Sequence, residues 1–162
     1  MDLPAASTRQ WQPASRHPWP GNEVSSVMPP LAALRTAASD ARAYVRSALA
    51  LWDLSHLADT AAAIVSELVA NAVNASTDEH GRPLYRDGGI LLVWVRLQAD
   101  EARLRAEVWD QAPGVPALQA IHNDSESGRG LAMVSALSDA WDWHPAASHP
   151  GKCVWAQIGI SP

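Results

Sequence analysis

Three polar side chains recur at helical spacing within an otherwise apolar stretch of this 162-residue chain. Glu67, Asn71 and Asn74 are four and three positions apart, which places them along one side of a helix. Burying a carboxylate or a carboxamide without a partner costs about 1–3 kcal/mol, so something polar must meet this stripe. One interpretation is a site whose oxygen atoms handle a metal ion and a proton. The alternative is a helix whose Glu67 and Asn71 face water.

The stripe needs a helix to carry it, and the sequence predicts one over residues 59–76. Asp59 and Thr60 are start signals, and a polar run from Thr77 breaks the pattern afterwards. The rest of the segment supplies apolar side chains at helical intervals, namely Ile64, Val65, Leu68, Val69, Ala72 and Val73. The predicted helix is therefore buried along most of its surface.

A second candidate site residue, Asp110, ends a predicted strand over residues 103–110. Leu104, Ala106 and Val108 alternate with polar residues, so Asp110 shares their face and points toward the core. An inward carboxylate at a strand terminus needs a hydrogen-bond donor. Asp110 is either a cap for the following turn or an anchor for a ligand.

A third candidate is the Gly128-Arg129-Gly130 run before a predicted helix over residues 131–137. It closes a long irregular loop over residues 111–128, a length typical of lids and binding segments. Glycines let backbone amides approach an anion at a helix N-terminus, although a tight turn explains the same pattern. The run is neither a dinucleotide-binding fingerprint nor a P-loop.

The remaining elements complete one domain. We expect an amphipathic helix over residues 31–52, a strand over 90–97 that forms a hairpin with 103–110, and strands over 140–144 and 152–158. Residues 1–30 contain six of the twelve prolines and are expected to form a flexible tail, in which Glu23 to Met28 could add an edge strand. The predicted architecture is a two-layer α/β sandwich over residues 31–160, with helices on one face of a mixed sheet.

Composition excludes several classes of protein. A net charge of −5 and no basic stripe argue against direct nucleic-acid binding. Cys153 is the only cysteine, so neither an internal disulfide nor a cysteine-based zinc site can form. No apolar run approaches 18 residues and no secretory signal is present, so we expect a cytoplasmic protein without membrane attachment.

The order of these segments is more specific than any one of them. ELVANAVNAS, VWDQAPGVP, SGRGLAMVSALSDAWDW and GKCVWAQI resemble the successive boxes of the nucleotide-binding domain of GHKL ATPases and kinases. Within that superfamily the chain most resembles the stand-alone anti-sigma-factor serine/threonine kinases of bacteria. The resemblance covers residues from about Leu31 to Ile158.

The resemblance implies ATP and Mg²⁺ as cofactors and a role for each candidate residue. Glu67 would be the general base, and Asn71 would bind ATP and hold Mg²⁺ through its side-chain oxygen. Asp110 would accept a hydrogen bond from the adenine amino group, and Gly114 would let the backbone approach the base and the sugar. The phosphates would lie against the backbone of Gly128, Arg129, Gly130 and Leu131. Asn74 matches no functional position of the family.

Three positions depart from the family pattern. Ala112 replaces a glycine, and it would be strained if its φ had to be positive. Ala75 stands where a histidine is frequent. Cys153 stands where threonine is usual, which would remove a hydroxyl that bridges to the base. Strand parity, however, places Cys153 on the face opposite that of Val154 and Ala156, so no firm role is assigned to it. These departures put affinity or turnover in doubt without removing Glu67, Asn71 or Asp110.

The expected function is an ATP- and Mg²⁺-dependent kinase that phosphorylates a serine of a small antagonist protein and regulates transcription by partner switching. Its partners would be a sigma factor, the antagonist (anti-anti-sigma) protein, or both, and relatives of this type form homodimers. The alternative is a nucleotide-responsive binding module with little or no kinase activity. A histidine-kinase fragment fits less well, because no helical hairpin with a phosphoacceptor histidine precedes the domain. An ATPase clamp would need a transducer domain after Ile158.

Overall fold

The computed structural model describes residues 23–116, 129–147 and 150–160. The helices and strands are β1 (Val24–Val27), β2 (Leu31–Ala32), α1 (Ala37–Leu51), η1 (Ser55–Leu57), α2 (Ala58–Ala75), β3 (Tyr85–Arg86), β4 (Gly89–Ile90), β5 (Leu92–Ala99), β6 (Arg103–Asp110), α3 (Arg129–Leu137), β7 (Ala140–Pro145) and β8 (Lys152–Gly159). The main sheet has the order β1-β5-β6-β8-β7, with β2 also pairing with β5. Every strand pair in the described ranges is antiparallel.

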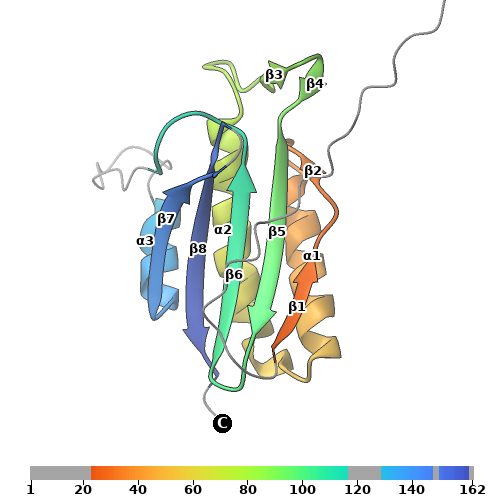
Figure 1. Cartoon of the computed structure of the whole chain (residues 1–162), viewed down its shortest axis with the longest axis vertical. Helices are drawn as coiled ribbons and strands as arrows, with labels where there is room; N and C mark the ends of the chain where they lie inside the picture. The colour runs from red at the N-terminus through yellow and green to blue at the C-terminus, as the bar shows by residue number, and fades with distance from the viewer. Residues whose placement is uncertain (1–22, 117–128, 148–149, 161–162) are drawn as a thin grey trace, which may run out of the picture.

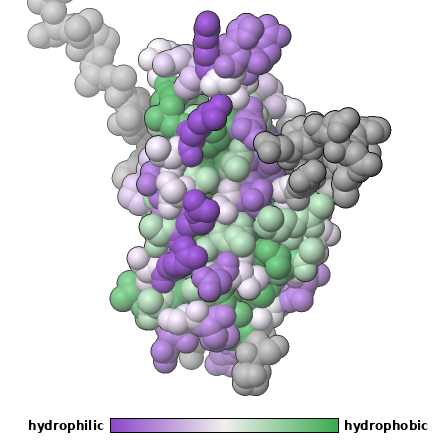
Figure 2. Space-filling view, turned by 180° about the vertical axis from the view of Figure 1, so that it is seen from behind, coloured by the Kyte–Doolittle hydropathy of each residue, from purple (hydrophilic) through white to green (hydrophobic). Residues whose placement is uncertain are grey.

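The predicted two-layer α/β sandwich is confirmed. The helices α1, α2 and α3 lie together on one side of the main sheet (Figure 1). The core fills the space between the layers, where Val65 and Leu68 of α2 and Val95 and Val108 of the sheet are all buried. Seen from the helix side, the surface carries many hydrophilic side chains between hydrophobic ones (Figure 2). The helices thus bury one stripe and expose the other, as amphipathic helices in a two-layer fold should.

The central helix α2 matches its prediction to within one residue at each end. Its first turn contains Asp59, whose negative charge suits the N-terminal end of a helix. Its buried residues are Ala61, Ala62, Ile64, Val65, Ser66, Leu68, Val69, Ala72 and Val73, which include all six apolar positions expected to drive its burial.

The helix predicted from residue 31 begins later, at Ala37. Leu31 and Ala32 instead form β2, and the backbone N–H of Ala33 donates to the carbonyl of Leu91 at 2.9 Å. Pairing with β5 holds these residues in an extended conformation. Apolar spacing alone does not show that residues 31 and 32 pair with a strand distant in the sequence.

The sheet also starts before the expected domain boundary at residue 31. β1 pairs with β5 at the edge of the sheet, in the position allowed for by the edge-strand interpretation of residues 23–28. The segment expected as a loop between residues 77 and 89 contains β3 and begins β4, which together form a separate two-stranded hairpin.

Strand parity divides the sheet into an inner face toward the helices and an outer face away from them. In the register, Leu104, Ala106 and Val108 of β6 lie beside Ala99, Leu97 and Val95 of β5 on the inner face. The intervening residues form the outer face, which consists of Trp94, Arg96 and Gln98 of β5, Arg105, Glu107 and Trp109 of β6, and Cys153, Trp155 and Gln157 of β8.

Candidate functional site

The candidate site lies at one end of the sandwich, between the sheet and the helices. The C-terminal half of α2, the end of β6, the start of β8 and the start of α3 all lie at this end of the molecule (Figure 1). Four elements that are distant in sequence therefore contribute to one region. All three candidate groups from the sequence are carried by these elements.

On α2, Glu67 and Asn71 are half-buried, whereas Asn74 is exposed. The Nδ2 atom of Asn71 is buried and has no hydrogen-bond partner among the residues that the structure describes. No hydrogen bond or ion pair within the described residues engages the Glu67 carboxylate. A buried amide donor without a partner costs free energy, so this site is suited to a polar ligand that would satisfy it.

The first turn of α3 packs directly against these two side chains. A Cβ atom built on Gly130 would lie 2.7 Å from Oε2 of Glu67 and 3.4 Å from both Nδ2 and Oδ1 of Asn71. Only glycine lets the α3 backbone come this close. The free N–H groups of a helix start thus lie beside the carboxylate and the carboxamide, an arrangement that suits a bound anion.

The structure describes two of the other three residues in the run from Gly128 to Leu131. Arg129 begins α3, and Leu131 is buried in the core with 5% of its surface exposed. Leu131 can contribute only its backbone to a ligand. Gly128 lies outside the described residues.

Gly130→Ala should separate stability from ligand binding. Alanine favours a helix over glycine by up to about 1 kcal/mol, so the melting temperature should stay equal or rise. The new methyl group would displace the Glu67 carboxylate and crowd Asn71, so binding of an anionic ligand at the α3 start should weaken. Thermal unfolding and a ligand titration on the same preparation measure the two effects. A variant that keeps full ligand affinity would contradict the tight α2–α3 contact.

Asp110 points to the inner face, as its parity predicts, and is 3% exposed. Its Oδ1 accepts hydrogen bonds from the backbone N–H of Ala112 and from Nζ of Lys152, each at 2.9 Å. The capping contact considered for this residue is therefore present. It uses one oxygen, and no described residue donates to Oδ2. Asp110 can cap its turn and still accept a hydrogen bond from a ligand.

Lys152 is a site residue that the sequence analysis missed. Its side chain is 6% exposed, that of Asp110 is 1% exposed, and the two residues are direct register partners on β8 and β6. The available signal was parity, because Lys152 shares the face of Val154 and Ala156. A buried lysine and a buried carboxylate at one strand end form a pair that is costly to break.

Cys153 lies on the face that strand parity predicts, away from Val154 and Ala156. Cys153 lies on the outer face in a small cluster with Trp94 and Trp109, on the opposite side of the sheet from the Asp110 carboxylate. A threonine there could not bridge to a base held by Asp110. The position that faces Asp110 belongs to Lys152, which brings an ammonium donor.

Burial raises the pKa of the Asp110 carboxyl above its ordinary value of 3.8. The hydrogen bond and charge of Lys152, with the N–H of Ala112, act in the opposite direction but do not cancel it. Removal from water is thus the dominant influence on this carboxylate. Perturbed acids in this kind of setting are common at functional sites.

The turn after Asp110 lacks the backbone strain that a positive φ at Ala112 would cause. Ala112 is fully buried, and the non-glycine residues with positive φ in the described ranges are Asp53 and Asp87, so Ala112 is unstrained. Gly114 does have a positive φ of 95°, and no described residue other than its chain neighbours comes within 4 Å of the place where its Cβ would be. The backbone at Gly114 is therefore open to a ligand.

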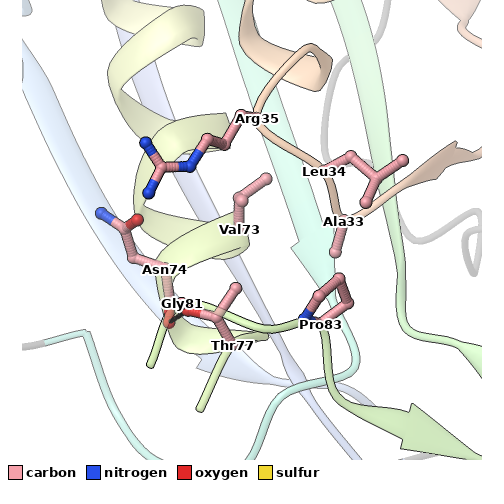
Figure 3. Close-up of a pocket in the computed structure, with 8 residues that line it drawn as sticks. All are labelled: Ala33, Leu34, Arg35, Val73, Asn74, Thr77, Gly81 and Pro83. Atoms are coloured by element: carbon pink, nitrogen blue, oxygen red, sulfur yellow. Dashed lines mark hydrogen bonds between the residues drawn. The ribbon is translucent and has the colours of Figure 1, made fainter. Parts of the chain in front are cut away.

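Asn74 belongs to a different feature. It lines a cavity of about 300 Å³ beside the last turn of α2, together with Ala33, Leu34, Arg35, Val73, Thr77, Gly81 and Pro83. The Arg35 side chain extends across α2 toward Asn74, and Ala33 and Pro83 form the opposite wall (Figure 3). None of Glu67, Asn71, Gly130 and Asp110 lines this cavity. Asn74 is thus separate from the candidate site, and the exposed Ala75 next to it makes no described contact with that site.

Within the described ranges no group of three or more His, Cys, Asp or Glu side chains is placed to hold a metal ion by itself. A hard cation such as Mg²⁺ could still be shared between the Asn71 oxygen and the phosphates of a ligand, which is how Mg²⁺ is commonly bound. No helix of the described residues is long and apolar enough to span a membrane.

Comparison with known proteins agrees with this geometry. The family model for the histidine kinase-like ATPase domain matches residues 31–158, which is most of the chain and includes every candidate site residue. Comparison with curated proteins finds no match. The chain therefore belongs to the histidine kinase-like ATPase domain family, which implies that it binds ATP.

Proposed function

We propose that the chain is an ATP- and Mg²⁺-dependent protein serine/threonine kinase of the anti-sigma type, which phosphorylates a small antagonist protein. The observation that carries this proposal is the contact of the α3 start with Glu67 and Asn71, which places a carboxylate beside a ready anion site. Phosphoryl transfer needs mainly positioning and charge stabilisation, and these few groups supply both.

Each side chain has one task in this proposal. The Glu67 carboxylate takes the proton from the attacking serine hydroxyl as the serine oxygen bonds to the γ-phosphorus. The bond from the γ-phosphorus to the oxygen that bridges it to the β-phosphate breaks in the same step, and ADP leaves. The unpaired Asn71 amide and the N–H groups of the α3 start bind the phosphates, and the Asn71 oxygen would hold Mg²⁺. Bound Mg²⁺ would neutralise phosphate charge during transfer.

Asp110 and Lys152 recognise the adenine of ATP in this proposal. The free Oδ2 of Asp110 accepts a hydrogen bond from the adenine amino group, and Nζ of Lys152 beside it can donate to the adjacent ring nitrogen. An acceptor next to a donor is complementary to the edge of adenine. Lys152 thus takes over the donor function expected of a threonine in this family.

The test of the kinase proposal is transfer of labelled phosphate from ATP to candidate antagonist proteins, with Mg²⁺ present and with Mg²⁺ chelated. The proposal predicts Mg²⁺-dependent labelling of a serine in the antagonist. Binding of ATP without transfer to any antagonist would reject the kinase and leave the binding module. Adding sigma factors to the same purified proteins tests the proposed partner switching. The molecular mass of the chain alone in solution tests whether it forms a homodimer.

The second candidate is a nucleotide-responsive binding module with little or no kinase activity. The departures from the family pattern at Ala112, Ala75 and Cys153 favour it. In that case a bound nucleotide would alter the affinity of the chain for its partner protein. Glu67→Gln would then change neither nucleotide binding nor that affinity.

ATP affinity should fall as the pH is lowered through the raised pKa of Asp110. The protonated acid is a poorer acceptor for the adenine amino group, and burial moves this loss to a higher pH than for an ordinary aspartate. The folded chain also holds this proton more tightly than the unfolded chain. Raising the pH through the same interval therefore removes a contribution of Asp110 to the free energy of unfolding.

Titrations of ATP into wild type and Asp110→Asn across a pH series check this prediction. The phosphates of ATP titrate equally in both experiments, so the difference between the two proteins isolates Asp110. Parallel pH profiles for the two proteins would show that Asp110 does not bind the base.

A further inference from the structure

A small hairpin outside the main sheet lies at the same end of the molecule as the candidate site. Its strands are β3 and β4, and they lie at that end together with the end of β6 and the start of β8 (Figure 1). Asp87 and Gly88 join the two strands with positive φ values of 52° and 79°, as the central residues of a type I′ turn do. The hairpin is therefore a regular element with a defined shape.

Backbone hydrogen bonds attach the hairpin to the fold. The N–H of Leu84, just before β3, donates to the carbonyl of Ser76 at the end of α2 at 2.8 Å. The N–H of Leu91, just after β4, donates to the carbonyl of Leu84 at 3.2 Å. The hairpin thus starts from the helix that carries Glu67 and Asn71.

Two further hydrogen bonds reach Gln111, the residue after Asp110. Nη1 of Arg86 on β3 donates to the backbone carbonyl of Gln111 at 3.0 Å, and the backbone N–H of Leu92 on β5 donates to its side-chain Oε1 at 2.9 Å. A Cβ atom built on Gly151 would lie 2.9 Å from Cα of Gln111, so the chain before β8 also packs closely on this residue. Gln111 is therefore held from three elements.

The peptide group between Gln111 and Ala112 links Arg86 to the Asp110 carboxylate. Its carbonyl accepts the hydrogen bond from Arg86, and its N–H, which belongs to Ala112, donates to Oδ1 of Asp110 at 2.9 Å. A peptide group is planar, so fixing the direction of the carbonyl also fixes the direction of the N–H. Arg86 therefore acts on Asp110 through one rigid group.

The charge of Arg86 strengthens this link. No ion pair within the described residues engages its guanidinium group, and a charged donor makes a hydrogen bond about twice as strong as a neutral one. Hydrogen bonds in a chain polarise one another, so the Ala112 N–H becomes a better donor to Asp110. Burial raises the pKa of the Asp110 carboxyl, and this N–H acts against that rise. Arg86 thus favours the ionised carboxylate in a fixed orientation.

We propose that Arg86 is a positioning residue of the nucleotide site, which orients the Asp110 carboxylate for the adenine amino group through the Gln111–Ala112 peptide. The β3–β4 hairpin is the element that holds Arg86 in place. This role rests on the proposed hydrogen bond between Asp110 and adenine. Because Arg86 acts through Asp110 and not by contact with the nucleotide, its effect should be confined to recognition of the amino group.

The experiment measures the affinity of the protein for ATP and for purine riboside triphosphate, which lacks only the amino group of adenine. Wild type should prefer ATP. Arg86→Ala should lower this preference by about 3- to 10-fold, the effect of weakening one hydrogen bond, and should leave the affinity for purine riboside triphosphate unchanged. The matched control is Arg82→Ala, which removes an exposed arginine from the loop before β3 and should keep the wild-type preference.

Two further variants show whether Arg86 acts through Asp110. In the Asp110→Asn background, Arg86→Ala should cause no further loss of preference, because both changes remove the same interaction. Arg86→Lys keeps a charged donor and should give a preference between those of wild type and Arg86→Ala. Denaturant titration shows which variants are folded, and Arg86→Lys carries the test if Arg86→Ala is not.

Two results would overturn the proposal. An unchanged preference for ATP in Arg86→Ala and Arg86→Lys would mean that Arg86 does not orient Asp110. Equal weakening of both ligands would mean that the hairpin only supports the fold. A wild type that binds both ligands equally would instead reject the hydrogen bond from adenine to Asp110, which is the assignment beneath this role.

Discussion

Glu67→Gln should lower the rate of phosphoryl transfer by about 100- to 10,000-fold, the usual contribution of a general base. Glutamine keeps the size and the hydrogen-bonding shape of glutamate but cannot accept the serine proton. ATP binding should change little, because the proposed phosphate contacts come from Asn71 and the start of α3. Single-turnover transfer to the antagonist, with ATP binding measured in parallel, separates the two effects.

The matched control for Glu67→Gln is Asp59→Asn on the same helix. Asp59 is exposed and pairs with Arg46, eight residues before the site, so its loss should leave the transfer rate unchanged. Transfer that survives Glu67→Gln at the wild-type rate would contradict the assignment of Glu67 as the base. If both variants lost activity equally, the effect would come from the helix as a whole.

Gly151→Ala should be strongly destabilising and should disrupt the Asp110 end of the site. Gly151 has a φ of 131°, and a Cβ atom there would lie 2.0 Å from the backbone oxygen of Asp110 and 2.9 Å from Cα of Gln111. Neither neighbour is the mobile end of a side chain, so the strands β6 and β8 would have to separate. Backbone strain and overpacking together should lower the free energy of unfolding by about 2–6 kcal/mol.

Denaturant titration measures this cost, and Gly88→Ala is the matched control. Gly88 also has a positive φ, of 79°, but no atom lies within 4 Å of its Cβ position. The free energy of unfolding of that variant should fall only by the cost of the left-handed conformation, about 1–2 kcal/mol. Equal losses for Gly88→Ala and Gly151→Ala would show that the contact between Gly151 and the Asp110 backbone is not tight.

Local patterns were sufficient for the parts of the site that lie within one element. The spacing of Glu67 and Asn71 on α2 and the parity of Asp110 on β6 depend only on helix and strand geometry, and the structure reproduces both. The start of α1 was misplaced because apolar spacing continues through Leu31 and Ala32, whereas pairing with β5 holds those residues extended.

Features that depend on two distant elements could not be predicted in this way. The Lys152–Asp110 pair exists because β8 aligns with β6 in one particular register, which no local pattern specifies. The contact of Gly130 with Glu67 likewise follows from how α3 packs on α2, and the sequence showed only that a glycine was present.

The outer face shows a further limit of local patterns. Alternation along β6 correctly separates Arg105, Glu107 and Trp109 from the core, and polar residues on one face normally indicate solvent. Glu107 is instead 2% exposed. Burial of that face depends on contacts between strands and on what covers the sheet, neither of which alternation reports.

Titration calorimetry of ATP into wild type and Asp110→Asn tests the assignment of the nucleotide site most directly. Wild type should bind ATP, and Asp110→Asn should bind it about 10- to 150-fold more weakly, because it loses a hydrogen bond to a charged acceptor. Glu107→Gln is the matched control, because it breaks a buried ion pair on the opposite face of the same strand and should leave affinity unchanged. Absence of ATP binding by wild type at millimolar concentration, or equal affinities for wild type and Asp110→Asn, would contradict the account.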